Sequence, residues 1–290
     1  MTRLADLVHT RHTARALGAG LARRLGATDR GGRVHSVFTR AVNLAWLEPG
    51  GGLLTLHGPA PLAAPFAVAL TAWPEDPGSH PWSLEPGMPV RVRAGHLVVG
   101  ELDVDWRCAR VTDLRVLPAE RAGATRERLM NALGSVAHLA GAAGLASVPG
   151  CAARAAASGA IRDRDPRALA LASRALMGLG EGLTPAGDDW LVGALAALHR
   201  LDQRWAFEDG HLASVLVGEA AARTTTIGAA FLAHALAGEF SEPARDLMTA
   251  DSLPCARAAA ARLSGMGATS GADTLAGMRA TVQMLREPCS

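Results

Sequence analysis

Two hydrophobic patterns divide the chain near Pro118. Before this residue, apolar residues come in short runs of strand length that Gly and Pro separate. They predict strands over residues 34–38, 41–47, 53–57, 66–71 and 96–103, with two shorter runs at 110–112 and 113–117. An opening helix is predicted over about residues 4–25. The first half is therefore predicted to be a mostly antiparallel sheet or small barrel that follows a helix.

After Pro118, Ala and Leu recur at helical spacing, with Gly or Pro at the joints. No strand pattern interrupts this part. It predicts helices over residues 119–143, 166–177, 187–201, 207–223, 228–238, 243–249, 254–265 and 271–285. We therefore expect an α+β protein, with an N-terminal helix plus β-rich domain over residues 1–117 and an all-helical domain over residues 118–290.

One segment of the helical half combines glycines, a hydroxyl and carboxylates. It reads GLGEGLTPAGDDWLVG over residues 178–193. Glycines such as Gly180 and Gly182 adopt backbone angles closed to other residues and bring amides close to a ligand. Thr184 and Pro185 are typical of a helix start. A Gly-rich loop that opens a helix binds anions, so we expect the functional site here.

Asp188 and Asp189 fall in the first turn of this predicted helix, where the helix dipole stabilises negative charge. A bound anion would meet a like charge there unless a cation lay between them. Three alternatives stay open: Mg²⁺ bridges the carboxylates to the ligand, one aspartate acts as a general base, or both only accept backbone hydrogen bonds. The candidate catalytic residues are Asp188, Asp189 and Thr184, and the loop residues predicted to bind the ligand are Gly180, Gly182 and Gly187.

A second segment repeats the pattern G-x-D-x-L-x-G of residues 187–193 at residues 271–277. Asp273 is the carboxylate of this copy, and Ser270 is predicted to cap its helix. Two helix starts that converge on one ligand would bring Asp189 and Asp273 to it. If a metal ion binds there, its ligands are Asp188, Asp189 and Asp273, although no His joins them at ligand spacing. Helix-start chemistry used twice is the alternative.

Arg223, Thr224 and Thr225 lie between the two copies, at the junction of two predicted helices. A guanidinium group, hydroxyls and helix amides together form a clamp for phosphate or carboxylate, although threonines also serve as ordinary helix caps. In the strand half, His35 and Asn43 are polar residues inside apolar runs. Both are candidate ligand-binding residues, with core hydrogen bonding as the alternative.

Composition excludes several kinds of chemistry. All 29 basic residues are Arg, and the chain has neither Lys nor Tyr. A Schiff base, a P-loop lysine and a tyrosine general acid are therefore excluded within this chain. The four cysteines have no C-x-x-C spacing, so we expect neither a disulfide framework nor a structural zinc.

Charge and hydropathy limit the partners and the location. A net charge of +2 is too small to indicate nucleic acid. No window approaches eighteen uninterrupted apolar residues, and charges interrupt the N-terminus. We therefore expect a cytoplasmic, bacterial-type protein with no membrane span and no nucleic-acid partner.

The segment GLGEGLTPAGDD at residues 178–189 resembles the signature of the AllH-like proteins. VHSVFTRAVNL at residues 34–44 and GATSGADTLAG at residues 267–277 resemble further segments of that family. The resemblance extends over about residues 33–279. It implies one subunit of oxamate carbamoyltransferase, which works with partner subunits in allantoin degradation and interconverts oxalurate plus phosphate with oxamate plus carbamoyl phosphate. It does not assign catalytic residues.

We therefore expect an enzyme or enzyme subunit that acts on a small carboxylate or carbamoyl compound. The expected partners are a small anionic substrate (carboxylate, phosphate or carbamoyl phosphate) and other subunits of the complex, and Mg²⁺ is the one cofactor left open. Two alternatives remain. One is a non-catalytic ligand-binding or regulatory subunit of a multi-chain complex. The other is a Mg²⁺-dependent hydrolase or phosphotransferase that uses Asp188, Asp189 and Asp273.

Overall fold

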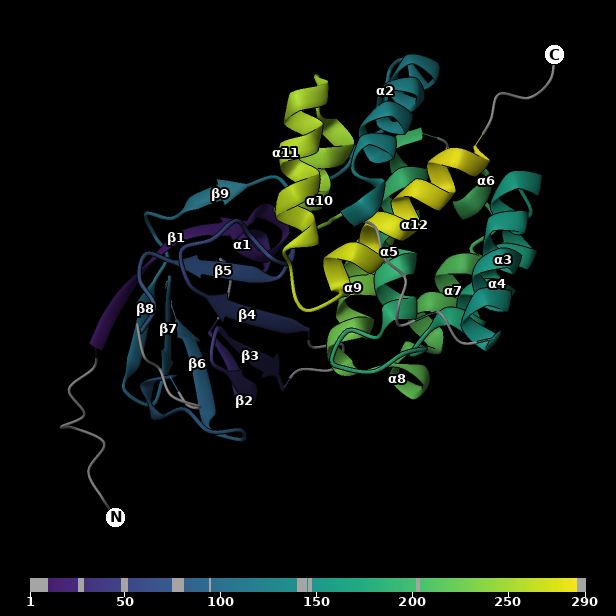
Figure 1. Cartoon of the computed structure of the whole chain (residues 1–290). Coiled ribbons are helices and arrows are strands. Elements are labelled where there is room, and N and C mark those ends of the chain that lie inside the picture. The colour runs from purple at the N-terminus through teal and green to yellow at the C-terminus, as the bar shows by residue number, and fades with distance from the viewer. Residues whose placement is uncertain are drawn as a thin grey trace. The chain divides into compact units, whose positions relative to one another are not determined.

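The computed structural model describes residues 10–25, 29–47, 52–74, 81–93, 95–139, 145, 148–201 and 204–285. The chain divides into two compact units, Met1–Leu114 and Arg115–Ser290. The first unit is built on a sheet and the second on helices (Figure 1). This confirms the predicted α+β class, with the strands before the helices. The predicted domain boundary falls after residue 117.

The sheet of the first unit closes on itself. The described strands lie in the order β5-β4-β3-β2-β6-β7-β8-β1-β9, and β1 also pairs with β5, which completes a ring of eight. Most neighbours are antiparallel, while β1 runs parallel to β8 and β9, and β4 parallel to β5. The strands are β1 (Thr10–Gly18), β2 (Arg30–Phe38), β3 (Ala41–Trp46), β4 (Leu53–His57), β5 (Ala67–Leu70), β6 (Pro89–Arg93), β7 (His96–Val99), β8 (Leu102–Asp105) and β9 (Arg110–Thr112).

The predicted opening helix is wrong over residues 10–18 and confirmed over residues 19–25. Residues 10–18 form strand β1, and only the short helix α1 (Ala19–Leu25) follows. Ala, Arg and Leu favour helices, but the burial of residues 13–16 alternates as in a strand. Pairing with β5, β8 and β9 overrides the local propensity. Residues 4–9 lie outside the described residues.

The other predicted strands are found except the one at residues 113–117. The run at 96–103 is two strands, β7 and β8, which turn at Gly100 with a positive φ of 55°. β6 was missed because it carries charge at every second position, although Val90 and Val92 are buried in the barrel. Residues 113–117 form no strand; their one described pairing is a single bridge from Arg115 to Glu239.

The helical unit contains the short 3₁₀ turn η2 (Ala137–Leu139) and a set of α-helices. These are α2 (Ala122–Ser135), α3 (Val148–Asp163), α4 (Pro166–Leu176), α5 (Ala186–Leu201), α6 (Arg204–Phe207), α7 (His211–Gly218), α8 (Ala220–Arg223), α9 (Thr226–Leu236), α10 (Glu242–Thr249), α11 (Leu253–Ser264) and α12 (Ser270–Met284).

Three departures from the predicted helices have local causes. Helix α3 was missed because Ala supplies most of its buried face, so it lacks a stripe of large apolar residues. The predicted helix at 207–223 is broken into three, with a left-handed Gly210 between α6 and α7. The prediction over 119–143 ends early, since α2 stops at Ser135, and residues 140–143 lie outside the described residues.

Helix α5 is the centre of this unit, because every residue from Ala186 to His199 is buried. Helix α12 crosses it at close range. A side chain at Gly193 of α5 would overlap the carbonyl oxygen of Thr274, and one at Gly277 of α12 would overlap that of Trp190. This close contact holds the first turns of both helices in place. No described helix is long and apolar enough to cross a membrane.

Candidate functional site

The Gly-rich loop between α4 and α5 adopts a conformation that requires glycine. Gly178, Gly180 and Gly182 have positive φ values of 71°, 110° and 97°. A side chain at Gly178 would overlap the carbonyl oxygen of Arg223, whereas the space beside Gly182 is open. The start of the loop is therefore packed against the end of α8, and its middle has room beside it.

Asp188 holds this loop to the junction of α8 and α9. Its Oδ1 accepts a hydrogen bond of 2.9 Å from the Gly178 amide, and its Oδ2 accepts one from the Thr224 hydroxyl. Asp188 is only 1% exposed. This burial raises the pKa of its carboxyl, and the two hydrogen-bond donors oppose the rise. A side chain at Gly228 would overlap Oδ2 of Asp188, so glycine at this position makes room for the carboxylate. Both oxygens are thus engaged in positioning.

Three helix starts meet at this loop. The Thr225 hydroxyl caps α9 by accepting a hydrogen bond of 2.9 Å from the Gly228 amide, and it donates to the Leu183 carbonyl of the loop. The Thr184 and Ser270 hydroxyls, which precede α5 and open α12, lie 2.7 Å apart in a hydrogen bond. Amides and hydroxyls of α5, α9 and α12 therefore gather around residues 178–185.

The predicted cap of α12 is wrong by one residue. Ser270 is the first residue of the helix, and the cap position is Thr269, whose side chain makes no capping bond. Ser270 is free to bond Thr184 because it does not cap its own helix. The two motif copies are joined through these hydroxyls, which agrees with the prediction that their helix starts converge.

Asp189 and Asp273 lie behind these hydroxyls with open hydrogen-bonding capacity. They are 7% and 0% exposed, and within the described chain neither Oδ2 of Asp189 nor either oxygen of Asp273 has a hydrogen-bond partner. A buried polar atom without a partner costs about 1–3 kcal/mol, so such groups are rare in folded proteins. These acceptors are therefore the strongest indication of a ligand site.

Burial raises the pKa of Asp189 to about 7; the nearby hydroxyls of Ser270 and Thr184 oppose this rise, and the charge of Asp273 adds to it. Burial also raises the pKa of Asp273. The charge of Arg154 opposes this rise, and so does the Thr269 hydroxyl, which lies near the carboxylate without reaching hydrogen-bond geometry. Asp189 therefore exchanges its proton near neutral pH.

Two other predicted residues have structural partners. Arg223 forms an ion pair of 2.7 Å with Glu219, so its guanidinium is engaged at the end of α7. Gly187 donates its amide to the Leu179 carbonyl, and a side chain there would overlap the Leu176 carbonyl oxygen. Their predicted contact with a ligand stays a prediction.

Asn43 and His35 belong to the barrel unit. Asn43 is buried, donates to the Ser36 hydroxyl at 3.0 Å and accepts from the Thr55 hydroxyl at 2.6 Å. His35 Nδ1 lies 3.1 Å from the same Ser36 oxygen. The network ties β2, β3 and β4 together and accounts for the polar residues in these strands, while their predicted role in binding stays untested.

Sequence reasoning missed two contributors to the site. Gly228 was predicted only as the first residue of a helix, and the reason for a glycine there lies in Asp188, 40 positions earlier in the chain (228 − 188). Glu219 also has a signal, because it lies four residues before Arg223 in a predicted helix, the spacing of a helical ion pair. Among the residues that the structure describes, no three His, Cys, Asp or Glu side chains gather as metal ligands do. The Mg²⁺ site at Asp188, Asp189 and Asp273 stays a prediction.

Comparison with known families identifies both units. Residues 176–282 match the family described as oxamate carbamoyltransferase subunit AllH, and residues 13–111 match the AllH family N-terminal domain. The first match covers the candidate site and the second covers the barrel strands. Neither the curated proteins nor the solved structures gave a match. Because the two matches together cover most of the chain, this protein belongs to the AllH family.

Proposed function

We propose that this chain is a subunit of an oxamate carbamoyltransferase and that the loop at residues 178–185 binds the substrate over Asp189 and Asp273. The family description supports the first statement. The carboxylate oxygens without partners support the second, and this observation carries the proposal.

The hydrogen-bonding groups of the site suit a carbamoyl compound. Oxamate and oxalurate present N–H donors at one end and a carboxylate at the other. Asp189 and Asp273 offer acceptors for N–H groups, while the Thr184 and Ser270 hydroxyls and the helix starts offer donors for anionic oxygens. A purely anionic ligand would leave the acceptors unmatched.

Asp189 is the proposed proton acceptor. The oxamate nitrogen forms a bond to the carbamoyl carbon of carbamoyl phosphate, the bond from that carbon to the phosphate oxygen breaks, and phosphate leaves with its electron pair. The proton lost by the nitrogen passes to the Asp189 carboxylate; in the reverse direction Asp189 returns it. A pKa of about 7 suits both directions near neutral pH. Asp188 acts as a positioning residue.

The test uses the complex assembled with its partner subunits. We expect Asp189→Asn to lower kcat for carbamoyl transfer about 10²–10⁴-fold, the usual contribution of general acid–base catalysis. Asp251→Asn, which changes an exposed aspartate of the same unit, should leave kcat unchanged. Full turnover by the Asp189 variant would remove the catalytic role.

The burial of the carboxylates favours one second candidate, a ligand-binding subunit whose partner carries out the chemistry. Asp189 is only 7% exposed, and Asp188 is fully engaged by its two donors. Calorimetric titration of the isolated chain with oxamate and with carbamoyl phosphate distinguishes the two. Binding that Asp189→Asn abolishes, combined with normal kcat at saturating substrate, would identify a binding subunit.

A further inference from the structure

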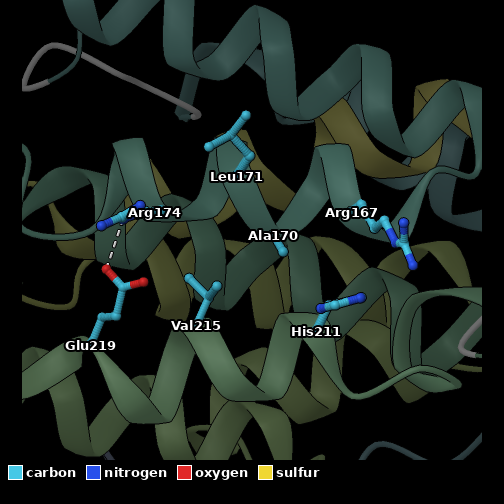
Figure 2. Close-up of a pocket in the computed structure, with 7 residues that line it drawn as sticks. All are labelled: Arg167, Ala170, Leu171, Arg174, His211, Val215 and Glu219. Atoms are coloured by element: carbon cyan, nitrogen blue, oxygen red, sulfur yellow. Dashed lines mark ion pairs between the residues drawn. The ribbon is translucent and has the colours of Figure 1, made fainter.

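A surface groove runs between α4 and α7, and none of the buried carboxylates of the candidate site lines it. The two helices lie side by side and line an open cavity of about 440 Å³ (Figure 2). Ala170 and Val215 line its apolar middle, and Leu171 at its edge is 67% exposed. We call this feature the α4–α7 groove.

Arginine side chains stand at both ends of the groove (Figure 2). At one end, Arg174 and Arg223 share a single carboxylate, since the Nε of each lies 2.7 Å from Oε2 of Glu219. At the other end, Arg167 lies beside His211, whose Nε2 is 3.8 Å from a carboxylate oxygen of Asp209. Among the described residues, the Arg167 guanidinium itself forms no ion pair or hydrogen bond. Arg167 and Arg174 are seven residues apart on α4, about 10 Å along the helix.

We propose that the α4–α7 groove binds an acidic segment of a partner subunit, which places an apolar side chain against Leu171 and Val215 and carboxylates against Arg167 and Arg174. This inference rests on the proposed function, because it requires a multi-subunit complex. The predominantly apolar middle favours a polypeptide over a free anion, which would leave Leu171 in water. The charge at both ends requires a partner segment with carboxylates about 10 Å apart.

Both walls of the groove lead directly into the candidate site. Helix α4 ends at Leu176, and Gly178 begins the loop two residues later. Helix α7 continues through Glu219 and α8 to Arg223, whose carbonyl packs on Gly178, and to Thr224. Gly178 and Thr224 are the two donors to Asp188. A segment bound across α4 and α7 therefore fixes the relative position of both donors.

The experiment measures assembly of the full-length chain with the other oxamate carbamoyltransferase subunits. We expect Leu171→Asp and Arg167→Glu to weaken assembly at least 30-fold, the effect of losing an interface hot spot. Val217→Asp is the matched control, because Val217 is a 59% exposed apolar residue of α7 outside the groove. It should change the affinity less than twofold. All three variants should have the same melting temperature as the wild type.

Hydrogen exchange gives a second readout. Complex formation should slow exchange at the amides of α4 and α7 in the wild type and leave them unchanged in Leu171→Asp. Wild-type affinity in both groove variants, or no complex with the wild type, would overturn the docking site. A self-dimer that Leu171→Asp dissociates would also overturn it, since the occupant would then be a second copy. Assembly without carbamoyl transfer would instead refute the proposed function and leave the docking site standing.

Discussion

Replacing Asp189 by Asn tests the electrostatics of the site directly. Burial raises the pKa of this carboxyl to about 7, compared with about 3.9 in an unfolded chain. The folded protein therefore keeps a proton that the unfolded chain releases between these pH values. The neutral carboxyl contributes fully to stability below pH 4, and this contribution is lost as the pH rises through 7. Asparagine has no such proton to lose.

The size of the effect follows from the two pKa values. Each pH unit between them lowers the free energy of unfolding by about 1.4 kcal/mol, so three units give about 4 kcal/mol. About 1.5 kcal/mol of this loss is already present at pH 5. The variant should therefore gain about 3 kcal/mol relative to the wild type between pH 5 and pH 8. A constant offset from the new amide group does not change this difference.

Urea unfolding of both proteins at pH 5, 6, 7 and 8 measures the difference. Asp251→Asn is the control, because this exposed aspartate should leave the pH dependence of the wild type unchanged. A difference between Asp189→Asn and wild type that varies by less than about 1 kcal/mol over this range would show that Asp189 does not hold its proton as described, which would also remove the basis for its role in proton transfer.

Two further substitutions test the packing around the site. Gly193→Ala places a methyl group on the carbonyl oxygen of Thr274 and should destabilise the protein by about 1–3 kcal/mol, measured by thermal melting. The control is Gly218→Ala in α7, where the new methyl group meets open space and should be neutral or stabilising. Thr224→Val removes a donor to Asp188 and should cost about 1–3 kcal/mol in urea unfolding, while the exposed Thr226→Val should change little. Equal stability of the two Thr variants would contradict the assigned bond.

The local features of the site were readable from the sequence because single residues determine them. Gly180 and Gly182 have positive φ values, which a tight turn requires and which glycine adopts most easily. The position of Asp188 and Asp189 in a first helical turn follows from Thr184 and Pro185 before them. Such signals lie within a few residues of one another, where local propensity decides the conformation.

The long-range partners were not readable in this way. Asp188 bonds Thr224, 36 positions away (224 − 188), and Thr184 bonds Ser270, 86 positions away (270 − 184). The repeated motif predicts that the starts of α5 and α12 converge, but nothing in the sequence specifies which side chains bond there or that α9 joins them. Strand β1 shows the same limit, since its residues favour a helix in isolation and become a strand only because three other strands pair with them.

The way β1 closes the barrel has a consequence for how the first unit forms. β1 is synthesised before its partners β5, β8 and β9, which come from residues 67–70, 102–105 and 110–112. The ring cannot shut until β8 has been synthesised, and until then β1 keeps an open edge on the side where β8 and β9 later pair. Damage to β1 would leave β5 and β8 without the strand that covers both, and exposed strand edges of this kind favour aggregation.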